Sequence, residues 1–408
     1  MRSDAARNWP AFRHVFYQAL LSAWPAAAKL GFAMLIPIVV LGRVELGPLS
    51  FGYRSFSRNV AIFVVLGAVL GARDLRLARS PLTAPLLAFL AAIWLSVWAN
   101  GGIMGDVRNF AAVVALFFAA RAIASSESGK RWLFHWLGAV SIAVLVTEVA
   151  ANPLVLTLRE SYRTELVSMH ANTIGECFAI LSPIFLADAL SRRGAVAGWI
   201  YAAIGLVDLL ISFSRAAWIA AIVGTVAVVL VKRAERTATR LRSPLIGAIV
   251  VGGVAIAYLS LGRTEADLQR LRIFQASLSL FREHWLFGVG FGIGNLQQLF
   301  PARYIELFGE GLFLFHSHNT YIDLLAGTGL IGTPIGLWLL FALARRAVQG
   351  TRTALSAAER LRAIGHVVAV GLLLLLGMTD TIFYNSHLMI VLAVAWALMD
   401  ADAARTPG

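Results

Sequence analysis

Two histidines stand at 316 and 318 in the segment HSHN, directly before a long apolar stretch. A neutral imidazole can accept a proton from a hydroxyl group as that hydroxyl attacks a substrate. A zinc site needs further His, Cys or carboxylate ligands, and none lies at a recognisable spacing from these two residues. The pattern therefore favours a general base over a metal site, with a structural histidine at a helix start as the alternative.

Arginines form the second group of residues that could do chemistry. Arg215 lies in LLISFSRAAWIAA, between two apolar runs, where a charge either reaches the membrane surface or contacts a ligand. Arg270 and Arg272 lie in the amphipathic stretch RLRIFQASLSLF. Because a guanidinium can grip a phosphate at two points, these residues favour an anionic, phosphate-bearing ligand. Which of the arginines would contact it stays open.

The composition determines what kind of fold must position these residues. The chain has 408 residues, of which 59% are hydrophobic and 14% charged, whereas a soluble domain has about 25% charged residues. Runs of roughly 20 apolar residues predict an all-α polytopic membrane protein with about twelve transmembrane helices. The predicted spans are 27–43, 58–72, 81–99, 108–125, 132–152, 172–191, 195–212, 215–231, 244–262, 319–344, 362–382 and 386–402.

Basic residues predict the orientation. Most of the 35 lysines and arginines fall in segments on one side of the predicted membrane, and such residues are retained in the cytoplasm. Both termini are therefore expected to be cytoplasmic. The net charge of +13 is spread over short loops, which argues against a nucleic-acid partner.

The predicted organisation has four parts. An interfacial amphipathic helix covers 1–26, the first nine spans cover 27–262, a long outer loop covers 263–317, and three spans cover 318–408. Loops as long as 263–317 are usually functional. Apolar residues at helical spacing predict an amphipathic helix there, and they are Leu268, Leu271, Phe274, Leu278 and Phe281.

Alternating glycines from Gly288 to Gly294 must break that helix, and a second short helix is expected over 295–308. The glycines do not form a nucleotide loop, since no strand precedes them and no Lys-Ser/Thr pair follows. A tight turn near a lipid-linked substrate or the membrane surface is the expected role.

Four segments resemble the O-antigen ligase and polymerase superfamily, and within it the O-antigen ligases. HSHNTYIDLLAGTGLIGT at 316–333 is the most specific, with a histidine, a small polar residue, nine residues and then G-x-x-G. SFSRAAWIA at 212–220 is similar to an S-x-S-R segment, and HANTIGE at 170–176 to an asparagine-bearing helix start. RLRIFQASLSLFREHWLFGVGFGIGN at 270–295 is similar to an arginine, an aromatic helix and a glycine turn, although Trp285 replaces the usual proline.

This resemblance implies an architecture like that of C-type membrane glycosyltransferases. It implies transfer of a polysaccharide from undecaprenyl pyrophosphate to the lipid A core, at the periplasmic face of the bacterial inner membrane, with inversion and without metal, nucleotide or other cofactor. Membrane lipids are the other expected partners, and nucleic acid is not one. The implied catalytic residues are His318, Arg215 and Arg270, and the implied substrate-binding residues are Arg272, Asn319, His316, Asn172 and Ser214.

In this scheme His318 takes the acceptor proton and is held by Asn319 or by a nearby acid such as Asp323. Three other functions remain open. A polymerase of the same superfamily would use a second lipid-linked glycan as acceptor, and a protein-glycan ligase would use a Ser, Thr or Tyr side chain. A secondary transporter is the non-enzyme alternative; it predicts paired halves with broken helices, and the sequence contains no internal repeat.

Overall fold

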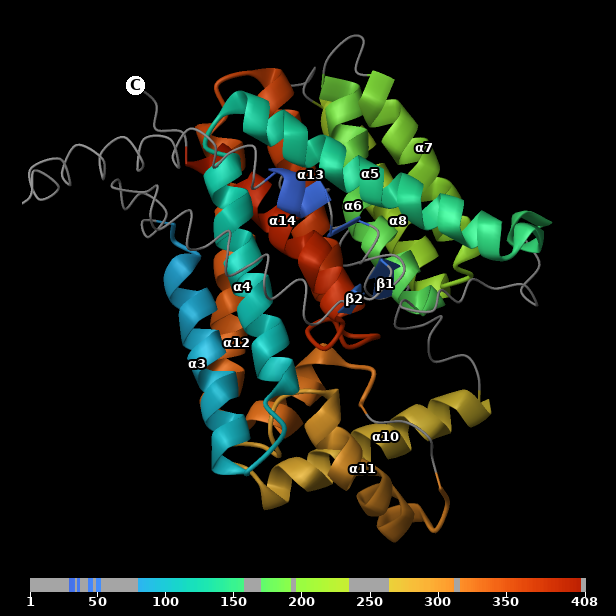
Figure 1. Ribbon diagram of the computed structural model, residues 1–408, viewed down its shortest axis with the longest axis vertical. Helices are drawn as coiled ribbons and strands as arrows, with labels where there is room; N and C mark the ends of the chain where they lie inside the picture. Colours follow the sequence, from blue (N-terminus) through green and yellow to red (C-terminus); the bar gives the residue numbers. More distant parts are fainter. Residues whose placement is uncertain are drawn as a thin grey trace, which may run out of the picture.

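A computed structural model describes residues 29–33, 35–36, 43–46, 49–52, 80–157, 170–191, 196–234, 264–311 and 316–404. The predicted interfacial helix over 1–26 and the predicted spans 58–72 and 244–262 lie outside these residues. The described part is a predominantly helical, polytopic membrane protein (Figure 1). Its main helices are α3 (Thr83–Ala99), α4 (Gly105–Ile123), α5 (Glu127–Ala151), α6 (Ala171–Ser191), α7 (Val196–Ile211), α8 (Arg215–Ala234), α10 (Thr264–Glu283), α11 (Ile293–Phe308), α12 (Thr320–Thr353), α13 (Ala357–Leu376) and α14 (Ser386–Ala403).

Predicted spans from 81–99 onward each coincide with a helix, except 244–262. Within the described residues, four helices are long and apolar enough to cross a membrane, namely Glu127–Ala151, Ala171–Ser191, Arg215–Arg233 and Thr320–Thr353. Thr83–Ala99 and Val196–Ile211 are apolar but shorter. The expected total of twelve spans therefore remains a prediction.

A short antiparallel hairpin was not predicted by the all-α interpretation. Strand β1 (Arg43–Leu46) pairs with β2 (Leu49–Gly52), and Leu46 lies opposite Leu49. The sequence between the two strands is Gly-Pro, and both are turn-forming residue types. In the sequence the hairpin follows the helical residues 29–33 and 35–36, in a stretch that the hydropathy pattern left as a connection.

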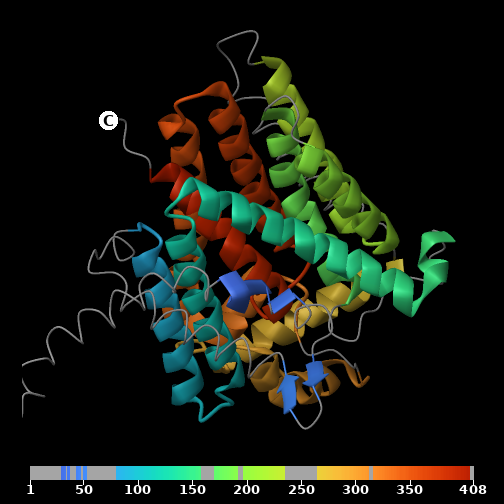
Figure 2. The same cartoon turned by 45° about the horizontal axis from the view of Figure 1, so that its top comes forward.

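Helix α14 lies at the centre of the bundle and packs against α4, α5, α6, α12 and α13. Its side chains from Leu388 to Met399 are almost fully buried. Helix α5 runs obliquely past α14 and α7 (Figures 1 and 2). Several helices begin at a side-chain cap; the Ser356 hydroxyl, for example, accepts the Glu359 N–H at the start of α13 at 3.1 Å.

Helices α10 and α11 form a layer across one end of the bundle, where α12 and α14 begin (Figure 1). The predicted apolar stripe of α10 is largely exposed, with Leu268 and Leu271 each 52% exposed. Ile273, Ala276 and Leu280 instead face the protein. The helix therefore has two apolar faces, and the stripe predicted from the sequence is the one that faces away from the protein.

Helix α12 is broken at Gly329, whose φ of 64° and ψ of −162° interrupt the helix. The glycine turn after α10 enters this break: Val289 N–H donates to the Ala326 carbonyl at 2.8 Å and Leu330 N–H to the Trp285 carbonyl at 2.8 Å. A Cβ atom on Gly329 would lie 2.4 Å from the Gly288 nitrogen, so the two backbones can meet only as glycines. The turn therefore fixes the α10–α11 layer to the broken helix.

Residues of α3 complete this junction. The Ser96 hydroxyl lies 2.6 Å from the Phe287 carbonyl and 2.7 Å from the Gly327 carbonyl. The Asn100 amide donates to the Gly288 carbonyl at 2.9 Å. Carbonyl groups freed by the break and the turn thus keep hydrogen-bond partners in an apolar setting.

The opposite end of the bundle, where α5 and α13 begin and α14 ends, holds a buried ion cluster. Asp400 is fully buried and contacts Arg121 Nε at 2.6 Å and Arg346 Nε at 2.5 Å. Arg346 also donates to the Asp400 carbonyl at 2.9 Å. The Arg121–Asp400–Arg346 cluster joins α4, α12 and α14 at this end.

Candidate functional site

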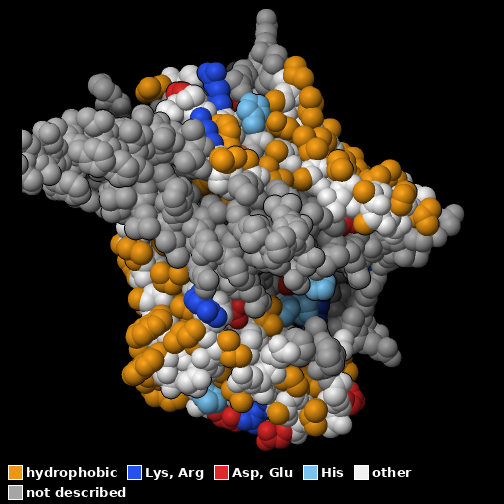
Figure 3. Space-filling view, viewed as in Figure 1, with side chains coloured by type: hydrophobic (Ala, Val, Ile, Leu, Met, Phe, Trp, Pro, Cys, Tyr) orange, Lys and Arg blue, Asp and Glu red, His pale blue; other side chains and the backbone are white. Residues whose placement is uncertain are grey.

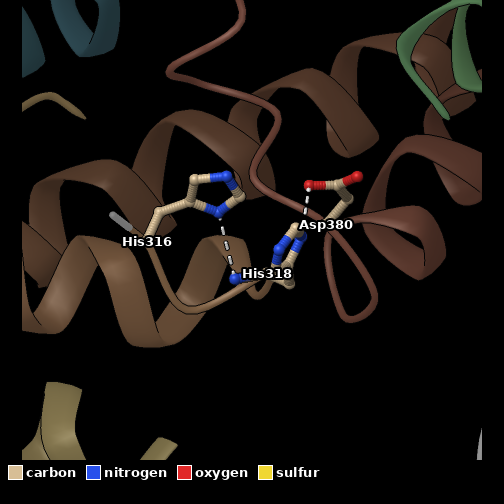
Figure 4. Close-up of side chains that lie close together, drawn as sticks. All are labelled: His316, His318 and Asp380. Atoms are coloured by element: carbon tan, nitrogen blue, oxygen red, sulfur yellow. Dashed lines mark hydrogen bonds and ion pairs between the residues drawn. The ribbon is translucent and has the colours of Figure 1, made fainter. Parts of the chain in front are cut away.

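His316 and His318 meet a carboxylate that follows α13. His318 Nδ1 lies 3.4 Å from Asp380 Oδ1, and the two imidazole centroids are 4.2 Å apart (Figure 4). The His318 backbone N–H donates to His316 Nδ1 at 3.2 Å. His318 Nε2 has no hydrogen-bond partner among the described residues, so this nitrogen is available to a ligand.

Polar side chains fix the loop that carries the histidines. Asp323, buried in the first turn of α12, accepts the Ser317 N–H at 2.8 Å and the hydroxyl of Thr381. Tyr384 donates to the Asp323 carbonyl at 3.0 Å. The acid expected to hold His318 therefore anchors the loop instead, and Asp380 is the carboxylate beside the imidazole.

Asn319 caps α12 rather than contacting the imidazole of His318. Its side-chain oxygen accepts the N–H groups of Tyr321 and Ile322 at 3.0 and 3.1 Å, and its amide donates to the Met378 carbonyl at 3.1 Å. The cap ties the start of α12 to the connection between α13 and α14. The side chain that contacts the imidazole of His318 is Asp380, and Asn319 holds the loop through backbone groups.

Backbone strain marks two of the sequence motifs. In the described part of the chain, His318 (φ 52°) and Phe213 (φ 49°) are the non-glycine residues with positive φ. Such conformations cost of order 1–3 kcal/mol each and cluster at functional sites. Phe213 lies in the SFSR turn directly before Ser214 and Arg215, so both motif segments hold a strained residue.

The site keeps His316 neutral and Asp380 charged at neutral pH. Burial and the neighbouring charge of His318 lower the pKa of His316 to about 4. Burial opposes the charge of Asp380, but the hydrogen bond from His318 and the charge that this imidazole carries when protonated outweigh it and lower the pKa of Asp380 to about 2. A fixed carboxylate beside one imidazole nitrogen orients a base of the kind used in proton transfer.

The start of α6 forms another wall. Glu176 is hydrogen-bonded to Asp380, and His170 is near enough to His316 to influence its pKa. The Asn385 amide contacts the Thr173 hydroxyl and joins α6 to the start of α14. Asn172 lies half-buried in the same first turn. The HANTIGE segment thus reaches the histidine loop.

Close packing brings the SFSR turn against α6. A Cβ atom on Gly175 would lie 2.7 Å from the Ser212 hydroxyl and 2.8 Å from the Ser214 Cβ. Ser214 is buried in this contact, while Arg215, the first residue of α8, is exposed. Figure 3 shows histidine and basic side chains in a hollow above the α10–α11 layer.

Arg270 and Arg272 have different surroundings in α10. Arg270 is exposed and has no ion-pair partner in the described part of the chain. Arg272 pairs with Glu310 at 3.0 Å and lies over the Phe308 ring, 5.5 Å from its centroid. The two guanidinium groups, two positions apart on a helix, therefore do not act as one clamp.

A metal ion is the alternative use of the histidine cluster. His316, His318 and Asp380 offer ligand atoms that all lie within 4.8 Å of one another. However, Nδ1 of His316 already accepts the His318 N–H, and His318 Nδ1 faces Asp380. These hydrogen bonds account for the positions of the two histidines and the aspartate without a metal ion. Activity in the presence of a chelator tests whether a metal ion binds there.

Asp380 is the residue of this candidate site that sequence reasoning missed. The predicted span 362–382 placed it inside a membrane helix, but α13 ends at Leu376 and residues 377–385 form an irregular connection. The signal was present in MTDTIFYN, where threonines, an aspartate and an asparagine interrupt two apolar runs. Helix boundaries are the least reliable part of such a prediction.

In a comparison with known protein families, residues 200–339 match the family described as O-antigen ligase. The matched range runs from α7 through the α10–α11 layer into α12. It contains the SFSR turn, the glycine turn and the histidine loop, whereas Asp380 lies beyond it. No curated protein matches the chain.

Proposed function

We propose, from the match of residues 200–339 to the O-antigen ligase family, that the chain transfers a glycan between two lipids. The donor is a polysaccharide on undecaprenyl pyrophosphate and the acceptor is a sugar of the lipid A core. The active site, at the end of the bundle covered by α10 and α11, faces the periplasm of the bacterial inner membrane. The observation that carries the proposal is the strained His318 beside Asp380, with Nε2 free for an acceptor hydroxyl.

The proposed step is a single displacement. The acceptor oxygen forms a bond to the anomeric carbon as the bond from that carbon to the pyrophosphate oxygen breaks, which inverts the carbon. His318 Nε2 receives the hydroxyl proton, and undecaprenyl pyrophosphate leaves with the bonding electron pair. The proton on His318 is then released to water.

Asp380 is the positioning residue in this step. It holds Nδ1 of His318 in the protonated form, so that Nε2 carries the lone pair, and its charge stabilises the imidazolium that develops. Neutral His316 accepts the backbone N–H of His318 and holds the loop in its strained form. Asn319 acts as the cap that sets the direction of α12.

Arg215 and Arg270 are proposed to stabilise the leaving pyrophosphate. Negative charge grows on the leaving oxygen in the transition state, and fixed guanidinium groups then bind it more strongly than in the ground state. Both arginines are exposed and have no ion-pair partner in the described residues. Arg272, already paired with Glu310, has a lesser role, and Ser214 and Asn172 line the donor side.

A broken helix is also what the transporter alternative predicts. In α12, however, the backbone of the glycine turn fills the break and uses its carbonyl groups, as the bond from Val289 to Ala326 illustrates. The break therefore supports anchoring of the α10–α11 layer rather than an ion site. A polymerase and a protein-glycan ligase would use the same base and differ only in the acceptor.

Lipopolysaccharide from a deletion strain tests the proposal. We expect a gel to show core without attached polysaccharide, restored by the wild-type gene and not by His318→Ala at equal protein level. Loss of long chains with a single repeat still attached to the core would identify a polymerase. An unchanged pattern in the deletion strain would overturn both assignments.

A further inference from the structure

A second polar cavity lies at the end of the bundle opposite the histidines. It has a volume of about 280 Å³ and is bounded by the starts of α5 and α13 and the ends of α6 and α14. Its polar lining includes Lys130, Arg131, Arg362, His366 and Asp402. This end is the one that the basic residues predict to be cytoplasmic.

Charges in this cavity are only partly paired. Lys130 lies 2.8 Å from Asp402 and 3.3 Å from Glu127, so one ammonium satisfies two of the lining acids. His366 Nε2 is 3.9 Å from the same Asp402. Arg131 and Arg362 have no ion-pair partner within the described residues. Asp188, the third lining acid, is buried and engaged in an interaction of its own.

The cavity walls are apolar below this polar rim. Phe134, Ile184 and Leu398 line it, and His135, hydrogen-bonded to Tyr201 at 2.9 Å, lies at its edge. Figure 3 shows basic, acidic and histidine side chains gathered at this end of the molecule. The polar side chains at the rim suit the headgroup of a membrane lipid, and the apolar side chains between the helices suit its acyl chain.

We propose that this cavity binds the phosphate headgroup of a membrane lipid. Basic pockets between helices on the cytoplasmic side are suited to lipid phosphates, and a guanidinium contacts phosphate at two points. Arg131 and Arg362 supply the free charges, Lys130 orders the rim through its acid partners, and an acyl chain runs along Phe134 and Ile184. The site is separate from the proposed glycan transfer, since it occupies the other end of α6, α13 and α14.

The proposal is tested by measuring how much lipid the purified full-length protein retains. Native mass spectrometry and thermal shift would be measured with phosphatidylglycerol, phosphatidylethanolamine or inorganic phosphate added. The double variant Arg131→Ala/Arg362→Ala removes the free charges of the cavity. Arg345→Ala/Arg352→Ala is the matched control, because it removes two exposed arginines from α12 that do not line the cavity.

We expect the cavity variant to bind lipid roughly 10- to 30-fold more weakly, since each basic residue near a lipid surface contributes about 1 kcal/mol. The control variant should bind as the wild type does. Equal lipid retention in both variants would overturn the proposal, and so would stabilisation by inorganic phosphate that matches either lipid. If the double variant fails to fold, Arg131→Ala, a change at an exposed residue, must still weaken lipid binding relative to Arg352→Ala.

Discussion

Two aspartates, one at each end of the same bundle, contact basic side chains in different ways. Asp400 is fully buried in regular helix and contacts two arginines at 2.5 and 2.6 Å. Asp380 lies in an irregular connection and contacts a histidine at 3.4 Å, in a loop where His318 has positive φ. Asp400 contacts the Nε atom of both arginines, whereas Asp380 contacts one nitrogen of its histidine and leaves the far nitrogen without a hydrogen-bond partner among the described residues.

This difference predicts that Asp400 contributes to the stability of the fold and that Asp380 contributes to catalysis. Removing one member of a buried ion pair leaves an uncompensated charge in an apolar setting, which is costly to the fold. Removing the carboxylate beside a base instead changes how the base is oriented and charged. The loop is still held by the hydrogen bond from the Ser317 N–H to Asp323 and by the one from the Asn319 amide to the Met378 carbonyl. The two ends should therefore respond to matched substitutions in opposite ways.

The largest contrast is expected from Asp380→Asn and Asp400→Asn. Asp380→Asn should lower the rate of glycan transfer by about 10² or more, because general-base catalysis contributes roughly 10²–10⁴-fold and depends on the base being correctly held. Its melting temperature should stay near that of the wild type. Asp400→Asn should lower the free energy of unfolding by about 3–5 kcal/mol.

Rates per folded molecule and thermal unfolding in one detergent would check this pair. Asp400→Asn should keep its transfer rate once the folded fraction is accounted for. A variant of Asp380 that loses stability but keeps its rate would mean that the two aspartates have the same structural role.

Substitution of the arginines near the histidine loop is expected to have the next largest effect on the transfer rate. If Arg215 and Arg270 contact pyrophosphate at two points each, lysine at either position should remain impaired by roughly 10-fold or more, since an ammonium cannot reproduce the fork. Arg272→Ala is the matched control and should cause a milder defect, because exposed ion pairs contribute about 0–1 kcal/mol. Full activity of Arg215→Lys would indicate that the charge merely reaches the membrane surface.

Acidification should slow transfer without weakening donor binding. His316 has a pKa of about 4 and Asp380 of about 2, so between pH 5 and 8 the first stays neutral and the second charged. A protonated imidazole cannot accept the acceptor hydroxyl proton, so acid that protonates the base slows the transfer step and leaves the donor-binding groups unchanged. The rate and the donor affinity should be measured over this range; a rate that rises on acidification contradicts the base.

Chelation should have no effect. His316, His318 and Asp380 lie within reach of one ion, yet their hydrogen bonds to one another account for their arrangement. We expect purified protein to transfer glycan at an unchanged rate in EDTA and without ATP. Loss of activity in EDTA that zinc or magnesium restores would reassign the cluster as a metal site.

Much of the fold was predictable from the sequence because membrane helices need long apolar runs. The approximate ranges of α5, α6, α8 and α12 follow from that rule. The turn at 288–294 was predictable because alternating glycines, which lack a side chain, break a helix. The break at Gly329 was not predicted, because the glycine lies in a continuous apolar run and only its contact with Gly288 reveals it. Local pattern cannot report a contact between segments about 40 residues apart.

The motif segments of the candidate site were predictable from the sequence, but the residues that contact them were not. His318 stands out as a polar residue before an apolar helix, and Arg215 as a charge between two apolar runs. Asp380 was hidden because the hydropathy boundary of α13 ran past its true end at Leu376. The capping of α12 by Asn319 was not predicted, since a helix cap and a ligand-binding residue use the same residue types.

Single-turnover transfer and donor affinity of His318→Ala test the central claim most directly, with His316→Ala measured in the same preparation. We predict that His318→Ala lowers turnover by about 10²–10⁴-fold while donor binding survives, because the arginines and not the base hold the pyrophosphate. His316→Ala should be much less harmful, since its imidazole supports the loop without receiving the proton. Near wild-type turnover in His318→Ala, or loss of donor binding in place of turnover, would contradict the assignment of His318 as the base.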